Sequence, residues 1–120
     1  MPSNPIFEKI AQEIQTHSVV LYMKGTKRMP MCGFSGFVVQ VLNRLGIEYH
    51  DVNVLEAPEI RQAIKEFSDW PTIPQLYIKG EFVGGADIVR EMTTSGDFIE
   101  LLQNKGIEFK ISPKDVEKRV

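Results

Sequence analysis

An uninterrupted apolar run, Val19 to Met23, constrains the fold of this 120-residue chain more than any other feature. A short run without polar interruptions is typical of a central strand that is buried on both faces. Such a strand needs helices on both sides of its sheet. Because 42% of the residues are hydrophobic and the chain has a single cysteine, one hydrophobic core without disulfide bonds must hold the fold together.

The sequence around this run predicts the helices that the strand requires. Apolar residues recur at helical spacing in several segments, Gly46 is placed to end a helix, and Lys79-Gly80 is placed to form a hairpin turn. We predict helices at 5–15, 33–45, from 58 to a break at 70–74, 87–94 and 97–103, with strands at 17–23, 48–54, 75–78 and 81–83. Two βα-type crossovers followed by a hairpin then give an α/β fold, a mixed four-stranded sheet flanked by helices on both faces. This order resembles the thioredoxin-like fold.

Charge and cysteine content limit the partners and the compartment. A net charge near −2 provides no electrostatic field for nucleic acid or for acidic membranes. We see no targeting segment and no stretch long enough to span a bilayer. A single cysteine suits a reducing compartment, and we expect the cytoplasm. Residues 1–106 are expected to form one domain, and residues 107–120 a solvated C-terminal tail.

Cys32 is the candidate reactive residue, because it lies between a loop and the start of a predicted helix. The partial positive charge at a helix N-terminus favours the thiolate over the thiol. A dithiol oxidoreductase would carry its second thiol at the position of Ser35, so the sulfur that completes any reaction of Cys32 must come from another molecule. The alternative is a buried cysteine that serves only as a small hydrophobic residue.

Four further motifs accompany this cysteine at other junctions of the predicted sheet. In chain order the full set is Lys24-Gly25-Thr26, Pro30, Cys32-Gly33-Phe34-Ser35, Trp70-Pro71-Thr72-Ile73-Pro74-Gln75 and Gly84-Gly85-Ala86-Asp87. The set resembles a monothiol glutaredoxin of the Cys-Gly-Phe-Ser class, and the resemblance covers roughly Ile6 to Lys105. It implies a glutathione site made by Lys24, Arg61, Ile73, Ala86 and Asp87, with Cys32 as the catalytic residue.

The resemblance also implies a role for each of these residues. A cis peptide bond at Pro74 would turn the backbone of Ile73 toward glutathione. Lys24 and Arg61 would bind the glycyl carboxylate, although both residue types are often simply solvated at such positions. The Gly84 to Asp87 turn would hold the γ-glutamyl end, while Asp87 would also cap a helix. Members of the class often carry cysteine or serine in place of Ala86, so only a backbone role carries over there.

Several other polar or aromatic residues have weaker assignments. His17 and His50 lack the spacing of metal ligands, and we interpret both as surface or strand-edge residues. Trp70 is interpreted as a packing residue, and Lys65 is weighed as an auxiliary to Arg61 at the same carboxylate but is not assigned to the site.

The function that the resemblance implies is iron–sulfur cluster transfer. A [2Fe–2S] cluster is held by four thiolates, and this chain provides one, Cys32, as the metal ligand. A homodimer bridged by two glutathiones would supply the other thiolates, and the cluster would be passed to apo iron–sulfur proteins. The class also pairs with BolA-like proteins.

Two other functions remain open. In the first, the Cys32 thiolate removes glutathione from protein mixed disulfides, which makes the protein a thiol–disulfide oxidoreductase. We rank the carrier first because the loop Thr26 to Met31 is longer than in dithiol glutaredoxins, a difference that by resemblance disfavours thiol exchange. In the second, the protein is an adaptor in which Cys32 is incidental.

Overall fold

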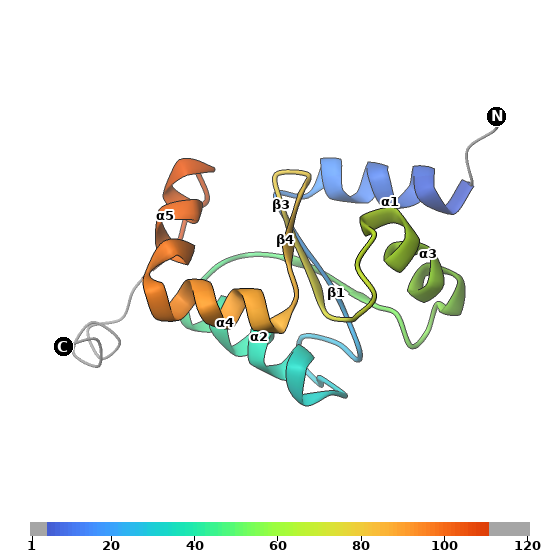
Figure 1. Ribbon diagram of the computed structural model, residues 1–120, viewed down its shortest axis with the longest axis horizontal. Helices are drawn as coiled ribbons and strands as arrows, with labels where there is room; N and C mark the ends of the chain where they lie inside the picture. The colour runs from blue at the N-terminus through green and yellow to red at the C-terminus, as the bar shows by residue number, and fades with distance from the viewer. Residues whose placement is uncertain (1–4, 111–120) are drawn as a thin grey trace.

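The structure, a computed structural model, describes residues 5–110 and contains nine helices and strands within that range (Figure 1). In chain order they are α1 (Pro5–Thr16), β1 (Val19–Met23), α2 (Gly33–Arg44), β2 (His50–Asn53), α3 (Pro58–Ser68), β3 (Gln75–Ile78), β4 (Glu81–Gly84), α4 (Ala86–Ser95) and α5 (Asp97–Asn104). Each element lies where the sequence predicts it, with shifts of a few residues at the ends.

The four strands form one sheet in the order β2-β1-β3-β4. Strand β1 pairs in parallel with β2 and antiparallel with β3, and β3 pairs antiparallel with β4. The predicted mixed sheet is therefore confirmed. Only the first of the two expected crossovers joins parallel strands, because β3 runs back along β1.

Helices cover both faces of the sheet, as the buried strand β1 requires (Figure 1). All five residues of β1 are buried, and they alternate between two separate hydrophobic clusters. Leu21 packs into the cluster formed with α2, α4 and α5, whereas Val20 and Tyr22 pack into the cluster formed with α1 and α3. The alternation follows from the two-residue period of a strand.

A buried hydrogen bond joins α1 to the sheet. The hydroxyl of Tyr22, fully buried in β1, donates to Oε1 of Glu13 at 2.6 Å. Burial, and then this bond to a carboxylate, raises the pKa of Tyr22 well above its ordinary value. The bond satisfies a hydroxyl that would otherwise be buried without a partner.

Local sequence signals predict the hairpin turn correctly, but they misplace one helix cap. Lys79 and Gly80 have φ values of 52° and 79°, the pair of positive angles that a tight hairpin turn needs. The prediction that Asp87 caps the following helix is wrong. Helix α4 begins at Ala86 with Gly85 at the N-cap, so Asp87 lies in the first turn. There its negative charge still interacts favourably with the positive end of the helix dipole.

The chain beyond α5 returns to the core instead of entering solvent at once. Ile107 is only 9% exposed and belongs to the cluster on the α2 side, and Phe109 packs against that cluster. The backbone N–H of Lys110 donates to the carbonyl of Leu45 at 2.6 Å. The expected solvated tail therefore does not begin at 107, and its remainder, 111–120, lies outside the described residues.

Candidate functional site

Cys32 lies at the N-cap of α2 with extended backbone angles, φ −153° and ψ 137°. Its carbonyl accepts a hydrogen bond from the N–H of Gly36 at 2.8 Å, which begins the helix. The side chain caps no backbone N–H, and the residue is partly exposed. The predicted junction of loop and helix is confirmed, and the sulfur is accessible to another molecule.

The start of α2 favours the thiolate form of Cys32. The backbone N–H of Ser35 is the largest cause of a lowered pKa, and the N–H of Phe34, the charge of Lys24 and the hydroxyl of Ser35 act in the same direction. Partial burial of the sulfur opposes them, but the pKa of Cys32 remains below its ordinary value. A thiolate is the form that attacks disulfides and binds metals.

Ser35 is not a free hydroxyl beside the thiol. It is fully buried, and its Oγ accepts a hydrogen bond from the backbone N–H of Lys24 at 3.1 Å. This bond ties the segment that follows β1 to the first turn of α2. Ser35, which stands where a dithiol oxidoreductase has its second thiol, therefore makes a structural contact.

A cleft of about 400 Å³ opens in front of Cys32. This size suits a small-molecule ligand. The cleft gathers every site residue that the sequence predicts, together with Lys65, Trp70 and Phe34. Its lining is Lys24, Cys32, Phe34, Arg61, Lys65, Trp70, Pro71, Thr72, Ile73, Pro74, Gly85, Ala86 and Asp87.

The charges in this cleft have a clear pattern. Three cations, from Lys24, Arg61 and Lys65, line it together with the single carboxylate of Asp87. Lys65 lies one helical turn after Arg61 on α3, so the i, i+4 spacing was the signal that could have assigned it from sequence. The cleft is suited to a ligand with more than one negative group and one positive group.

The wall opposite the thiol is built from a bend and a close approach of two segments. The bond between Ile73 and Pro74 is cis, as expected. A Cβ on Gly85 would lie 3.1 Å from the carbonyl oxygen of Pro74 and 3.3 Å from Nε1 of Trp70, so glycine lets α4 begin against this bend. The Trp70 ring packs against Phe82 with centroids 5.6 Å apart, but Trp70 also lines the cleft, a contact that the packing interpretation missed.

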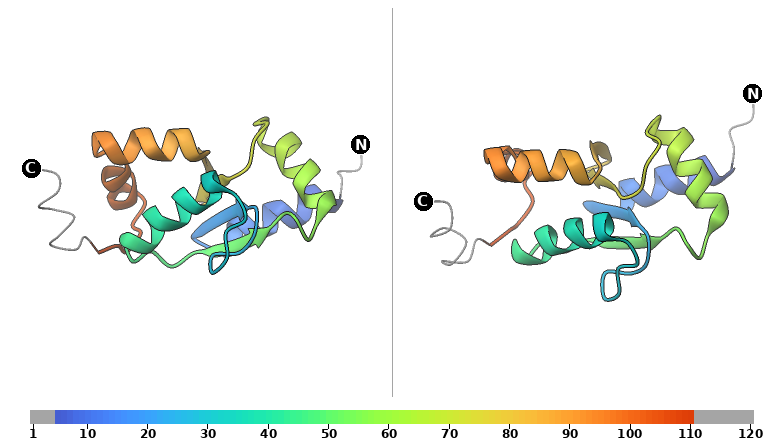
Figure 2. Two further views of the ribbon diagram at one scale, coloured as in Figure 1. Left: turned by 90° about the horizontal axis from the view of Figure 1, so that it is seen from below. Right: turned by 60° about the horizontal axis from the view of Figure 1, so that its bottom comes forward.

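The loop between β1 and Cys32 projects from the body of the protein (Figure 2). It closes on itself, because Thr26 and Met29 exchange backbone hydrogen bonds of 3.1 and 3.0 Å. The N–H of Met31 donates to the carbonyl of Lys24 at 2.9 Å, so the two ends of the loop meet at the cleft. Met29 and Met31 are 68% and 63% exposed, and Phe34 beyond the thiol is 59% exposed.

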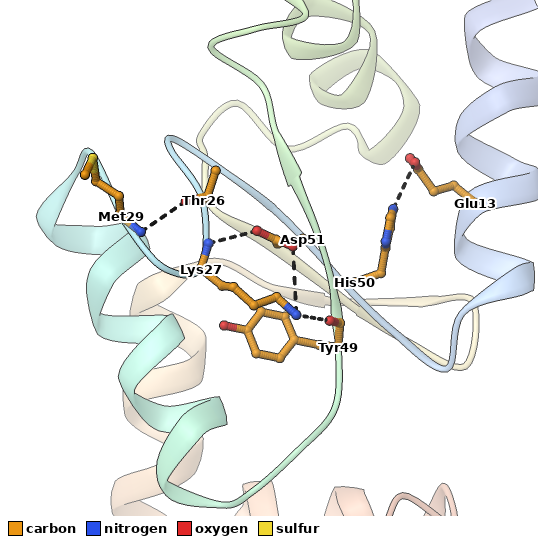
Figure 3. Close-up of polar contacts among 7 residues, drawn as sticks. All are labelled: Glu13, Thr26, Lys27, Met29, Tyr49, His50 and Asp51. Carbon is orange, nitrogen blue, oxygen red and sulfur yellow. Dashed lines mark hydrogen bonds and ion pairs between the residues drawn. The ribbon is translucent and has the colours of Figure 1, made fainter.

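The two histidines lie away from this cleft. Their rings stack with centroids 4.1 Å apart, and His50 Nε2 lies 3.4 Å from Oε2 of Glu13 (Figure 3). Sequence reasoning missed the stacking, because His17 and His50 meet only through the pairing of β1 with β2. Within residues 5–110, no group of three or more His, Cys, Asp or Glu side chains could hold a metal ion.

The comparisons with known proteins agree with this arrangement of thiol, cleft and sheet. Residues 19–83 match the family model of glutaredoxin, and this segment runs from the first residue of β1 to the third residue of β4. The chain belongs to the glutaredoxin family. A probable monothiol glutaredoxin 2 of Rickettsia felis is 54% identical over 103 residues, which cover 86% of this chain and 99% of that protein.

Two further comparisons extend over most of this glutaredoxin. The mitochondrial glutaredoxin-related protein 5 of Danio rerio is 45% identical over 113 residues, covering 93% of this chain and 73% of that protein. A solution structure of a monomeric truncated mutant of Trypanosoma brucei 1-C-Grx1 superposes with a TM-score of 0.81 at 44% identity. That superposition covers 92% of this chain and 100% of that one. The resemblance to the monothiol class is confirmed, and so is the thioredoxin-like fold.

No helix within residues 5–110 is long and apolar enough to cross a bilayer.

Proposed function

We propose that this glutaredoxin binds glutathione in the cleft and, as a homodimer bridged by two glutathiones, carries a [2Fe–2S] cluster to apo-proteins in iron–sulfur cluster assembly. The observation that carries the proposal is the placement of one activated thiolate beside a cleft lined by three cations and one carboxylate. Glutathione has two carboxylates and one ammonium group, so its charges complement those of the cleft.

Each group of the cleft has a defined role in this proposal. Lys24 and Arg61 bind the glycyl carboxylate. The planar guanidinium group of Arg61 can donate two parallel hydrogen bonds to it. The backbone of Ile73 pairs with the peptide backbone of glutathione, as an added strand would. The N–H of Ala86 at the start of α4 and the carboxylate of Asp87 hold the two charges of the γ-glutamyl end. These contacts orient the glutathione sulfur toward Cys32.

The [2Fe–2S] cluster is the cargo, and it needs more thiolate ligands than one chain provides. Four thiolates hold a [2Fe–2S] cluster, and Cys32 is the single cysteine of this chain. Two copies and two glutathiones supply four sulfurs without any other protein ligand. The exposed Met29, Met31 and Phe34 around the thiol support a seam between two copies, because large apolar residues grouped on a surface mark interaction sites. Ligands that exchange with free glutathione make the cluster transferable.

A second candidate function rests on the lowered pKa of Cys32. The Cys32 thiolate attacks the glutathione sulfur of a protein mixed disulfide, and the protein leaves as a thiol. A second glutathione thiolate then attacks the Cys32–glutathione disulfide, which forms oxidised glutathione and regenerates the Cys32 thiolate. The same cleft serves both functions. We rank the oxidoreductase second because the loop before Cys32 is longer than in dithiol glutaredoxins, a difference that by resemblance disfavours thiol exchange.

The remaining partners and the location are part of the proposal. By resemblance to its class, the protein pairs with a BolA-like protein and acts in the cytoplasm. The third candidate, an adaptor with an incidental thiol, is tested by Cys32→Ser. Unchanged function of this variant in cells would support the adaptor, and loss of function would exclude it.

Anaerobic reconstitution tests the proposed function directly. The protein is incubated with iron, sulfide and a sulfur donor, with and without glutathione, and the product is analysed by absorbance and gel filtration. We expect a brown dimer that forms only with glutathione and that does not form with Cys32→Ser. A colourless monomer that turns over a glutathionylated disulfide would instead support the oxidoreductase.

A further inference from the structure

Burial contributes little to holding the loop from Gly25 to Met31 in place, because most of its residues are exposed or half-buried. Thr26, Arg28 and Met29 are exposed, and the loop projects from the sheet (Figure 2). An exposed segment that buries little apolar surface depends on polar contacts to offset the entropy lost when it is ordered. The contacts that fix this loop to the sheet therefore decide how firmly it is held.

Strand β2, at the edge of the sheet, provides two such contacts through its side chains. Oδ1 of Asn53 accepts the N–H of Gly25 at 2.9 Å and fixes the base of the loop. Oδ2 of Asp51 accepts the N–H of Lys27 at 2.8 Å, farther along the loop (Figure 3). Polar side chains of β2, and not the backbone of a further strand, thus accept the hydrogen bonds that the loop backbone donates.

The side chain of Lys27 completes the contact with β2. Its Nζ donates to the carbonyl of Tyr49 at 2.6 Å, lies 4.2 Å from the centre of the Tyr49 ring and lies 3.9 Å from Oδ1 of Asp51 (Figure 3). Tyr49 itself is 9% exposed and belongs to the core on the α2 side. One lysine therefore connects the loop to a residue that is fixed by packing.

The loop is in turn connected to both sides of the cleft mouth. The N–H of Met31, the residue before Cys32, donates to the carbonyl of Lys24, and the N–H of Lys24 donates to Ser35. A displacement of the loop therefore moves the backbone on which Lys24 and Cys32 are carried. Both residues line the cleft.

We propose that Lys27 is a positioning residue, whose contact with Tyr49 and Asp51 holds the loop and, through it, the groups that keep glutathione beside Cys32. The inference rests on the proposed function, because a cluster ligated by two copies of Cys32 and two glutathiones needs all four thiolates held in place for as long as it is carried. Lys27 touches neither the cleft nor the thiol.

The test compares three variants of the full chain. Lys27→Met keeps the length of the side chain but removes its charge and its donors. Lys27→Arg keeps a charge and donors, and because a guanidinium group also binds over a tyrosine ring it should retain the wild-type behaviour. Arg28→Met is the matched control, because it removes a neighbouring cation of the same loop that is exposed and makes no polar contact within residues 5–110.

Three quantities are measured on each variant. They are the hydrogen exchange rate of the Thr26 and Met29 amides, the affinity for glutathione by NMR titration, and the half-life of the reconstituted cluster. For Lys27→Met we expect faster amide exchange and a loss of about two- to fivefold in both glutathione affinity and cluster half-life, the range of one partly exposed ion pair. Lys27→Arg and Arg28→Met should match the wild type.

Each negative result has a separate meaning. Unchanged amide exchange in Lys27→Met would show that the contact does not hold the loop, and faster exchange with unchanged glutathione affinity would show that the loop does not position the ligand. Either result overturns the inference, as does an equal loss in Arg28→Met, which would assign the effect to charge alone. A wild-type protein that forms no glutathione-dependent cluster overturns the proposed function instead, and glutathione affinity then still decides the role of Lys27.

Discussion

The backbone N–H of Lys24 donates a hydrogen bond of 3.1 Å to Oγ of Ser35, and Ser35 is fully buried. The bond joins the end of β1 to the first turn of α2, the two segments that carry Lys24 and Cys32. The residue that replaces a second thiol therefore has a structural task at the site. This explains why the site holds its shape although it cannot form an internal disulfide.

Replacing Ser35 by cysteine should increase thiol–disulfide exchange. The Ser35 hydroxyl is one of the groups that lower the pKa of Cys32, so it lies close to the Cys32 sulfur. A sulfur at position 35 is therefore within reach of Cys32 and can resolve a mixed disulfide. Turnover of a glutathionylated substrate is the measurement, and Ser35→Ala is the control because it removes the hydrogen bond without adding a thiol. Absence of any gain in turnover would show that the two positions do not have the geometry of a dithiol site.

Replacing Lys24 by glutamine should weaken both glutathione binding and cluster retention. The variant removes a cation from the cleft and one of the causes of the lowered pKa of Cys32. Loss of one charge-assisted hydrogen bond, about 1.5–3 kcal/mol, should lower the glutathione affinity by about ten- to a hundredfold, measured by titration. Lys9→Gln removes an exposed cation of α1 that does not line the cleft and should have no effect. Cluster retention equal to that of the wild type would contradict the role assigned to Lys24.

The pH dependence of alkylation should reveal the environment of Cys32. Because the N–H groups at the start of α2 lower the pKa of this thiol, the thiolate persists to lower pH than in a free cysteine, whose pKa is about 8.5. The rate of reaction with iodoacetamide should therefore reach half of its plateau below that value. In Lys24→Gln the midpoint should move upward. A wild-type midpoint at or above that of a free thiol would disprove the assignment.

Gly25→Ala should destabilise the loop and the fold. Gly25 has a φ of 90°, and a Cβ there would lie 2.4 Å from the carbonyl oxygen of Met29 and 2.6 Å from the backbone nitrogen of Met31. The positive φ alone costs about 1–2 kcal/mol for a residue with a side chain, and the clash with backbone atoms adds to it. The free energy of unfolding in urea measures the loss. Gly33→Ala is the matched control, since its Cβ would meet nothing within 4 Å, and it should be tolerated.

Tyr22→Phe should lower the free energy of unfolding more than Tyr77→Phe. The Tyr22 hydroxyl donates at 2.6 Å to the carboxylate of Glu13, whereas the Tyr77 hydroxyl donates at 3.2 Å to the neutral side chain of Gln75. Hydrogen bonds to charged groups contribute about 1.5–3 kcal/mol, and neutral ones about 0.5–1.5 kcal/mol. Thermal and urea unfolding of both variants measure the difference, and an equal loss would show that the bond to Glu13 contributes no more than the bond to Gln75.

Much of the fold follows from local sequence patterns, and the resemblance to the monothiol class implies most residues of the cleft. The apolar run of β1, the helix stop at Gly46 and the turn at Lys79-Gly80 are signals that act over a few residues, and each is confirmed. The predicted site residues meet in one cleft because the ends of neighbouring elements meet at one end of the sheet. The position of the helix cap at Gly85 was missed, since Asp87 two residues later gives an equally good capping signal.

The order of elements, the buried strand and the lone thiol at a helix start can be predicted from the sequence alone, because they depend on residue type and on short-range spacing. Which distant residues meet depends on the tertiary structure. The contacts of Lys27 with Tyr49 and Asp51 and the stacking of His17 on His50 arise only when β1 and β2 pair. The packing of Ile107 against the core likewise depends on the path of the chain after α5. Such contacts have no local signal, since their free energy comes from surfaces that exist only once the sheet and its helices have assembled.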